Sequence, residues 1–399
     1  MTTKSLAPAP LRRIPFCRVS CDGNELAYVK DVLESGWLTT ASRAHDFERH
    51  FAEAVGARFA CAVNSCTSAL HLALEALDVK PGDEVIVPTM TFTATAEVVR
   101  YLGADPVLVD VEYGTGLITP EILLDAVEHH PRAKALMVVH YAGQPALMLG
   151  GNGRAGILDI CRRSGLRVVE DAAHAFPTRC ESLMIGGIGD ATCFSFYANK
   201  TITTGEGGML TTNNPAIDAR VRVMRLHGID RDIWSRFTEA TPSWEYDVVA
   251  PGFKYNMPDI NAAIGLAQLE RAALMRDRRQ RLATHYFERL AGLEDIDLPI
   301  VRVPFEDHAW HLFVLVVRPT AKLCRNRLIE ILTERGIGTS VPYKPLHRLS
   351  YYRDHYPLSP ADFPEAERIW SGCLALPLYP SLTEEDQDYL CDILIELLG

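Results

Sequence analysis

An alternation of short apolar runs with helical patterns, between residues 58 and 212, most constrains the fold. In order, the apolar runs are FACAVNS, DEVIVPT, DPVLVDVE, AKALMVVHYAG and LRVVEDAAHA. They are nearly continuous Val, Ile, Leu and Ala, which is typical of strands buried on both faces of a largely parallel sheet. The helical stretches between them include two that end at Gly103 and Gly165, where a left-handed residue is expected. The sequence therefore predicts an open α/β sheet covered by helices.

The pattern changes after about residue 250. The stretch MPDINAAIGLAQLERAALMRDRRQRLATHYFERL predicts one long helix that starts near Pro258. HLFVLVVRP, RNRLIEILTERGIGTSVPY and TEEDQDYLCDILIELL then predict a strand, a helix followed by a strand, and a closing helix that Thr383 caps. We therefore expect a disordered tip at 1–14, a large α/β domain at 15–250, and a smaller α+β domain at 251–399 that begins with the long linking helix.

Composition limits the ligands that the chain can bind. The formal net charge of -11 argues against a nucleic-acid surface, which requires clustered Lys and Arg. The 10 cysteines show no CxxC and no paired Cys/His spacing, so they indicate neither a metal site nor a disulfide framework. Such cysteines are typical of reduced thiols in a cytoplasmic protein. MTTKSLAPAP lacks the apolar run of a signal peptide, and we expect no membrane span.

Chemically useful side chains follow the predicted strands, where ligands bind in an open α/β sheet. Asp171 ends the run LRVVED, and His174 comes three residues later. Thr67 and Ser68 open the helix after FACAVNS, and Phe92 follows DEVIVPT. Taken singly, each has an ordinary structural interpretation: a turn for the Asp, helix caps for the Thr and Ser, and core positions for the His and Phe.

The stretch CFSFYANKTITTGEGGML adds Lys200, with Ser195 five residues before it and a glycine turn after it. The combined groups satisfy one cofactor, pyridoxal phosphate (PLP). This cofactor requires an amine for a Schiff base, a carboxylate at its pyridine nitrogen, a flat side chain against its ring and an anion cradle for its phosphate. The start of the helix at Thr67 provides such a cradle, because backbone N–H groups and the helix dipole favour an anion there.

Three blocks, VEDAAHAF, FSFYANKTITTGEGGML and GFKYNMPDINAAIGLAQLE, resemble the signature blocks of the DegT-type sugar aminotransferases. These are PLP enzymes of the aspartate-aminotransferase fold, fold type I, and the resemblance covers the chain after residue 14. VLESGWLTT, VHYAGQPA and HAWHLFVL are most similar to the members that make UDP-4-amino-4-deoxy-L-arabinose. Cys66 and Ala41 stand where many relatives have glycine, and FPTRCESLMIGGIGD differs from the usual spacer.

The resemblance implies the catalytic roles. Lys200 would bond to the cofactor and then carry the proton between the substrate carbon and the cofactor. Asp171 would pair with the pyridine nitrogen. His174 would lie near the O3′ side of the ring, and Phe92 would stack on the ring.

The resemblance also implies the remaining contacts. Thr67, Ser68 and Ser195 would bind the phosphate. Lys254 would reach the phosphate of a partner chain across a two-fold axis, which predicts a homodimer with shared active sites; the alternative is an ordinary solvated lysine. No metal is expected. The family has its substrate contacts in segments comparable to those that contain His140, Tyr141 and Lys344. Four further residues in such segments are named as sugar contacts: His308, His311, Tyr343 and His347.

We therefore expect a transaminase of EC 2.6.1 type that converts a keto group of a nucleotide-linked sugar, at C4, into an amine with L-glutamate as donor. An aminotransferase for a free keto-cyclitol or antibiotic precursor is an alternative. Two others are a PLP-dependent sugar dehydratase, whose relatives carry His in place of the lysine, and a catalytically silent regulatory homologue. Lys200 argues against the dehydratase, and Lys200 together with Asp171 argues against the silent homologue.

Overall fold

The structure is a computed structural model that describes residues 12–151, 153–230 and 245–399. Its centre is a seven-stranded sheet in the order β1-β9-β8-β5-β4-β2-β3. The strands are β1 (Phe59–Val63), β2 (Glu84–Pro88), β3 (Asp105–Val109), β4 (Ala133–Val139), β5 (Arg167–Asp171), β8 (Ala191–Ser195) and β9 (Gly208–Thr212). Neighbouring strands from β3 to β8 run parallel, and β9 lies antiparallel to β8 and β1. The predicted, largely parallel sheet is confirmed.

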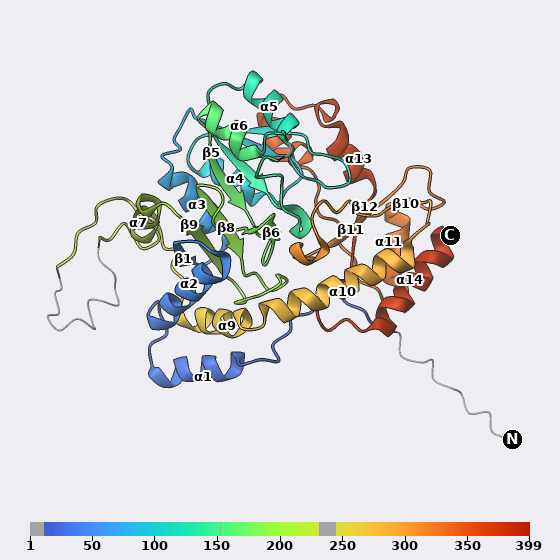
Figure 1. Ribbon diagram of the computed structural model, residues 1–399, viewed down its shortest axis with the longest axis horizontal. Coiled ribbons are helices and arrows are strands. Elements are labelled where there is room, and N and C mark those ends of the chain that lie inside the picture. Colours follow the sequence, from blue (N-terminus) through green and yellow to red (C-terminus); the bar gives the residue numbers. More distant parts are fainter. Residues whose placement is uncertain (1–11, 152, 231–244) are drawn as a thin grey trace.

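Helices cover both faces of this sheet (Figure 1). They are α2 (Ser42–Val55), α3 (Cys66–Ala76), α4 (Ala94–Tyr101), α5 (Pro120–His129), α6 (Ile157–Ser164), α7 (Pro215–Met224) and α9 (Asp259–Leu269), and α1 (Glu25–Ser35) packs on α9. Successive residues of β4 enter opposite apolar clusters. Leu136 and Val138 pack with α2, α5 and α6, whereas Ala135 and Met137 pack with α3, α4 and α7. The strands are therefore buried on both faces, as their continuous apolar sequences predict.

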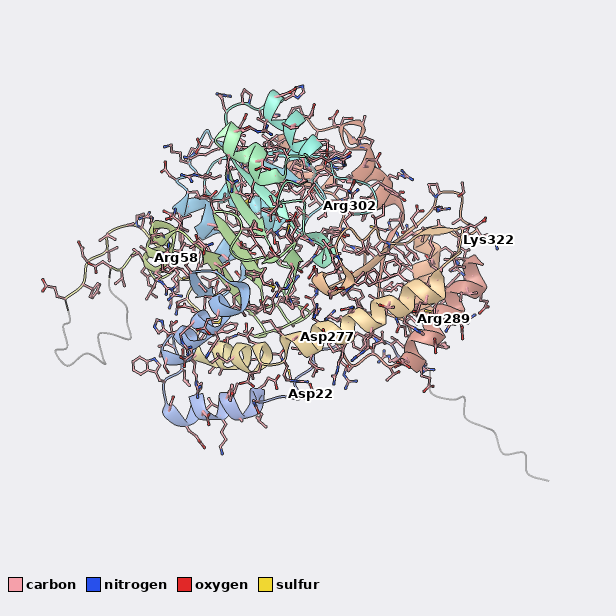
Figure 2. All side chains as sticks on the ribbon, in the orientation of Figure 1. Asp22, Arg58, Asp277, Arg289, Arg302 and Lys322 are labelled. Carbon is pink, nitrogen blue, oxygen red and sulfur yellow. The ribbon has the colours of Figure 1, made fainter. Side chains whose placement is uncertain are left out.

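The smaller lobe contains a three-stranded antiparallel sheet in the order β10-β11-β12. Its strands are β10 (Ile296–Asp297), β11 (Phe313–Val317) and β12 (Cys373–Leu376). Its helices are α10 (Ala272–Leu290), α11 (Arg325–Glu334), α12 (Ser350–His355), α13 (Pro364–Gly372) and α14 (Glu384–Leu398). Arg289 of α10, labelled in Figure 2, forms ion pairs with Asp388 and Asp392 of α14. Thr383 Oγ1 accepts the N–H of Asp386 at 3.1 Å, so the predicted cap of the closing helix is confirmed.

The single long helix predicted from Pro258 onward is wrong, because α9 ends at Leu269 and α10 begins at Ala272. Arg271 leaves helical geometry at φ -114° and ψ 4°. Its guanidinium pairs with Asp22 at 2.7 Å, which ties the break to the segment before α1. In Figure 1 the two helices follow one another nearly end to end, with α9 above α1 at the lower left and α10 rising to the right beside α14. Neither Gly nor Pro marks this break, so the sequence contains no local stop signal.

Three other expectations differ from the structure at the lobe boundaries. Residues 1–11 of the expected disordered tip lie outside the described residues, but Ile14 is buried and pairs with Ile337. The strand expected after α11 is reduced to this bridge and one between Ser340 and Ala375. Met275 packs in the core of the large sheet and Leu282 in that of the small lobe, so the apolar cores divide within α10 and not at residue 250.

A shared apolar cluster joins the two lobes. Val139 at the end of β4 and Met90 after β2 pack in the same cluster as Val314 of β11 and Ile369 of α13. Tyr343, from the loop before α12, packs against this cluster. The small lobe is thereby placed beside the carboxyl ends of the central strands. Across the described residues, no helix is long and apolar enough to cross a membrane.

Candidate active site

A cavity of about 410 Å³ lies at the carboxyl ends of the central strands. Its volume lies within the range of about 300–1,000 Å³ that is usual for small-molecule sites. It brings together most of the residues expected to bind the cofactor: Thr67, Phe92, Asp171, His174, Ser195 and Lys200. Ser68 and Lys254 are not among its lining residues.

Lys200 lies in the loop between β8 and β9, where its backbone N–H donates to the carbonyl of Tyr197 at 2.9 Å. Burial is the main cause that lowers the pKa of its amine to about 8, and the neighbouring Cys66 and Asp171 act in the opposite direction. A lower pKa increases the fraction of neutral amine near neutral pH. Because only the neutral amine attacks a carbonyl carbon, this environment suits a nucleophilic lysine.

Asp171 is the last residue of β5 and is buried. Its Oδ1 accepts the N–H of Ala173 at 3.1 Å, and its Oδ2 accepts the hydroxyl of Thr95 at 2.7 Å. Burial raises the pKa of this carboxyl, although both hydrogen bonds and Lys200 oppose the rise. No ion pair to Asp171 is found within the described ranges, although a buried carboxylate normally requires a cationic partner. A protonated ring nitrogen of a ligand would satisfy it.

Thr95 is a site residue that the sequence interpretation missed. Its hydroxyl lies 2.7 Å from the hydroxyl of Thr91, in addition to its bond to Asp171. If Asp171 is ionised, Thr95 donates to the carboxylate and Thr91 donates to Thr95. The repeated threonines of TMTFTATAEVV, at the start of α4 and one turn from Phe92, are the signal that could have identified it.

His140 and Glu170 form a fully buried pair next to Asp171, and this pair helps to fix the end of the strand that carries Asp171. His140 Nε2 lies 2.9 Å from Glu170 Oε2, and its Nδ1 accepts the N–H of Ala146 at 3.1 Å. The backbone N–H of His140 donates to the carbonyl of Asp171 at 3.1 Å. His140, which sequence comparison placed near the sugar, therefore lines the cavity while fixing the strand end that carries Asp171.

The start of α3 provides the expected anion cradle, with Cys66 and Thr67 in the cavity wall. Ser65 is the N-cap, and its hydroxyl accepts the N–H of Ser68 at 3.1 Å. The hydroxyl of Ser68 donates to Asn64 at 2.6 Å, so Ser68 stabilises the turn and does not face the cavity. A Cβ on Gly208 would lie 2.4 Å from the carbonyl carbon of Ser65. Glycine therefore lets β9 pass close to this cradle.

Of the four residues expected to contact the sugar, only Tyr343 lines the cavity. His308 is buried against the ring of Trp310, and the backbone N–H of Trp310 donates to His308 Nδ1 at 2.8 Å. His347 bridges Thr89 and Glu367 at 2.8 and 2.7 Å and so anchors the small lobe.

His311 stacks behind His174, with ring centroids 4.4 Å apart. Of the remaining residues in these segments, Tyr141 donates its hydroxyl to the carbonyl of Pro342, and Lys344 is exposed. Neither of them lines the cavity. The family resemblance had suggested these segments for sugar contacts, and in the structure the direction of each side chain decides whether it lines the cavity.

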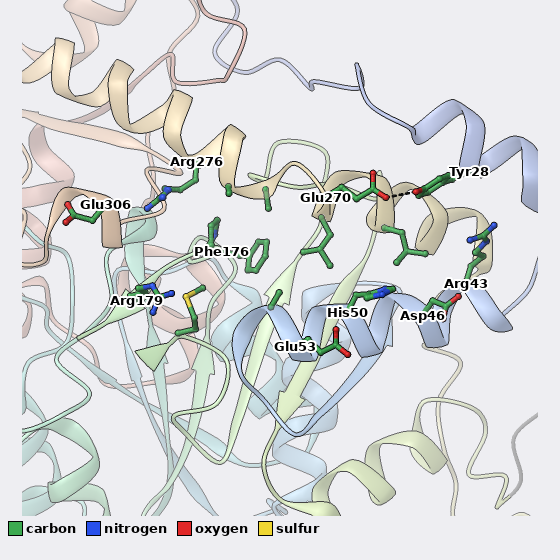
Figure 3. A pocket seen from close by; sticks show the side chains of 17 residues that line it. Tyr28, Arg43, Asp46, His50, Glu53, Phe176, Arg179, Glu270, Arg276 and Glu306 are labelled. Atoms are coloured by element: carbon green, nitrogen blue, oxygen red, sulfur yellow. Dashed lines mark hydrogen bonds between the residues drawn. The ribbon is translucent and has the colours of Figure 1, made fainter. Parts of the chain in front are cut away.

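A larger cavity of about 800 Å³ lies between α2, α9, α10 and the hairpin of β6 (Arg179–Cys180) and β7 (Leu183–Met184). Figure 3 shows its mixed charges, including Arg43, Glu53 and Arg276, and the hydrogen bond from Tyr28 to Glu270. Its lining contains neither a lysine nor a cysteine. Size therefore does not identify the reactive site, and the smaller cavity around Lys200 carries the chemistry.

The residues present fit PLP. Lys200 would supply the amine for covalent attachment, and Asp171, which has no cationic partner among the described residues, would face the ring nitrogen. Phe92 would offer a ring face, and the start of α3 would hold the phosphate. When bound, PLP supplies the electron sink that lets a C–H bond next to nitrogen ionise. The fold and the site together define a PLP-dependent enzyme of fold type I.

The chain belongs to the DegT/DnrJ/EryC1/StrS aminotransferase family, whose model matches residues 20–395. It is 43% identical over 377 residues to the spore coat polysaccharide biosynthesis protein SpsC of Bacillus subtilis, with 94% of each chain covered. The PLP form of the candidate sugar aminotransferase Spr1654 of Streptococcus pneumoniae superimposes with a TM-score of 0.85 at 30% identity, covering 97% and 98% of the chains.

Helicobacter pylori PseC, an aminotransferase involved in the biosynthesis of pseudoaminic acid, gives a TM-score of 0.87 at 25% identity and covers 97% and 99% of the chains. The protein is therefore a PLP-dependent sugar aminotransferase. This confirms the expected family, fold type, enzyme class and cofactor.

Proposed function

We propose that this aminotransferase converts the keto group at C4 of a nucleotide-linked sugar into an amine, with L-glutamate as donor and 2-oxoglutarate as the second product. The cavity around Lys200 is the observation that supports this most directly. It has room for the cofactor and a sugar ring, and its exposed flank carries Phe92 and Tyr197, which are 57% and 49% exposed. A nucleotide would then bind outside the cavity.

The relatives support the same substrate class. SpsC is named for spore coat polysaccharide biosynthesis, and PseC is described as an aminotransferase involved in the biosynthesis of pseudoaminic acid. In the proposed reaction, Lys200 moves a proton at the carbon that carries nitrogen, while Asp171 holds the ring nitrogen charged. Donor and acceptor use this one site in turn, which predicts ping-pong kinetics.

The direct test is mass spectrometry of the purified enzyme with L-glutamate and a panel of UDP-, dTDP- and GDP-linked 4-keto sugars. A free keto-cyclitol and a 3-keto sugar nucleotide serve as controls. The proposal predicts an amino-sugar nucleotide together with 2-oxoglutarate. Amination of the free cyclitol alone would contradict the nucleotide, and amination of the 3-keto sugar alone would contradict the C4 assignment.

UDP without a sugar is expected to inhibit competitively against the keto-sugar substrate. Much of the binding free energy of such a substrate comes from the diphosphate and base, which lie remote from the reacting carbon. Initial rates at varied sugar concentration would show a higher KM with unchanged kcat. If neither UDP, dTDP nor GDP inhibits, the substrate is not a nucleotide sugar.

We also propose a homodimer in which Lys254 of one chain completes the phosphate site of its partner. A cytoplasmic location is proposed as well, because all ten cysteines are unpaired and a reducing compartment keeps thiols reduced. Lys254 is exposed, and its amine bonds to Asn256, outside the chain's own cavity. Val248 and Val249, which precede it, are also more than half exposed. An exposed apolar strip next to a basic side chain is suited to a subunit contact.

Mixed dimers test this arrangement. If Lys200 and Lys254 serve one site from different chains, a heterodimer of Lys200→Ala and Lys254→Ala chains has one site with both lesions and one with neither. We expect activity up to about one wild-type site per heterodimer, measured after co-expression with two affinity tags. Lys344→Ala chains, which lose an exposed lysine elsewhere, provide the control. No recovery in isolated heterodimers with inactive parents would contradict the shared site.

A further inference from the structure

We propose that Tyr343 is the hydrogen-bond donor through which the cavity recognises an oxygen atom of its ligand, and that His174 fixes the direction of this donation. The proposal rests on the cofactor chemistry of the family and is independent of which sugar is aminated. In this proposal Tyr343 contacts the ligand directly, and His174 is a positioning residue that acts only through Tyr343.

The first step is the tautomer of His174. The backbone N–H of Ala142 lies 3.2 Å from His174 Nδ1. A backbone N–H can only donate, so Nδ1 must present its lone pair. Burial, assisted by the nearby Lys200, lowers the pKa of His174 well below its usual value, so the ring is neutral. A neutral imidazole whose Nδ1 accepts must carry its hydrogen on Nε2.

The second step is the hydroxyl of Tyr343, which lies 3.0 Å from His174 Nε2. Because Nε2 carries the hydrogen, it donates and the phenol oxygen accepts. The hydrogen of the phenol is therefore not used in this bond. No second hydrogen-bond partner of the Tyr343 hydroxyl is found among the described residues, and Tyr343 lines the same cavity as Lys200 and Asp171. The free O–H is thus available to an acceptor in that cavity.

The third step is how firmly this donor is held. The ring of Tyr343 stacks on His174 at an interplanar angle of 24°, and Phe92 lies 5.9 Å away between ring centroids. The preceding residue, Pro342, accepts the hydroxyl of Tyr141. Burial raises the pKa of the Tyr343 phenol far above neutral, so it stays protonated and remains a donor. The arrangement places a neutral, oriented O–H in the cavity that Lys200 also lines.

The ligand atom must be an oxygen with a free lone pair. Two groups of the bound state have this chemistry: the phenolic oxygen of the cofactor ring and the carbonyl oxygen of the keto sugar. Either is a stronger acceptor than water when it carries negative charge in a water-excluded cavity. The Tyr343→Phe holoenzyme distinguishes them, because this variant keeps the ring and removes only the hydroxyl.

If the acceptor is on the cofactor, Tyr343→Phe shifts the pH at which the absorbance of bound PLP titrates by about half a unit or more, without any sugar present. If the acceptor is on the sugar, this titration stays in place and kcat/KM for the keto sugar falls about tenfold, while the single-turnover rate with L-glutamate changes less than about twofold. Tyr352→Phe removes a phenol hydroxyl outside the cavity and is the control. If Tyr343→Phe matches this control in all three measurements, the proposal is overturned.

Two variants of His174 test the direction of donation. Glutamine has one accepting and one donating end, like the assigned tautomer, and can bond to Ala142 and Tyr343 in the same sense. Glutamate only accepts, so it would take the hydrogen of Tyr343 away from the cavity. We expect His174→Glu to reproduce the change seen in Tyr343→Phe, in the same measurement. We expect His174→Gln to keep the titration near the wild-type pH if the acceptor is on the cofactor, or to keep a kcat/KM at least about fivefold above that of His174→Glu if it is on the sugar. Equal losses in the two variants would overturn the assigned direction.

Discussion

Lys200→Ala is expected to abolish amino transfer, with a loss of more than about 10³-fold in kcat, because in the proposed reaction this residue supplies both the covalent attachment and the proton carrier. The visible absorbance of covalently attached cofactor should disappear, and borohydride reduction should no longer add the mass of PLP to the chain. The fold should remain intact, because the amine is a partly buried group whose pKa burial lowers to about 8, and its removal relieves a desolvation cost.

Lys200→Arg is the matched control, since it keeps a cation and most of the side-chain volume. We expect it to be as inactive as the alanine variant, which would separate the chemistry of the amine from its charge. Circular dichroism and thermal unfolding establish that both variants are folded. Substantial turnover by either folded variant would show that another residue carries the reaction.

Asp171→Asn should reduce kcat/KM by about a hundredfold, on the order of 3 kcal/mol, which is the scale of a charge-assisted hydrogen bond lost in a water-excluded site. The single oxygen of asparagine can still accept the N–H of Ala173, and its NH2 group can donate to the hydroxyl of Thr95, which accepts as well as donates, so the turn should stay in place. What it lacks is the charge that keeps a ring nitrogen protonated. Single-turnover rates with L-glutamate measure this loss directly.

Thr95→Val tests the hydrogen bond that positions the Asp171 carboxylate, while the charge of that carboxylate is kept. It keeps the shape of the side chain and removes one hydrogen bond to Asp171, worth about 1 kcal/mol, so we expect a loss of only about threefold to tenfold. With both substrates, kcat/KM should decrease from the wild type to Thr95→Val and decrease further in Asp171→Asn. If Asp171→Asn were nearly as active as the wild type, the carboxylate would be a turn residue only.

Local pattern was sufficient for most of the central sheet. The continuous apolar runs marked strands buried on both faces, and Gly103 and Gly165 marked helix ends, where both residues have positive φ. The break at Arg271 could not be predicted in this way. It is held by an ion pair to Asp22, and such a pairing between distant residues leaves no mark in the periodicity of either segment.

The candidate active site also has a part that the sequence predicted and a part that only the tertiary structure decided. The sequence by itself predicted the reactive groups, because Asp171 ends one strand and Lys200 follows another, and the carboxyl ends of parallel strands meet at one edge of the sheet. Only the tertiary structure decided which neighbours act on them. Two histidines that were both expected at the site have different partners, since His308 packs on Trp310 and His174 bonds to Tyr343. Side-chain direction depends on how the two lobes pack, and that packing is a property of the whole chain rather than of any segment.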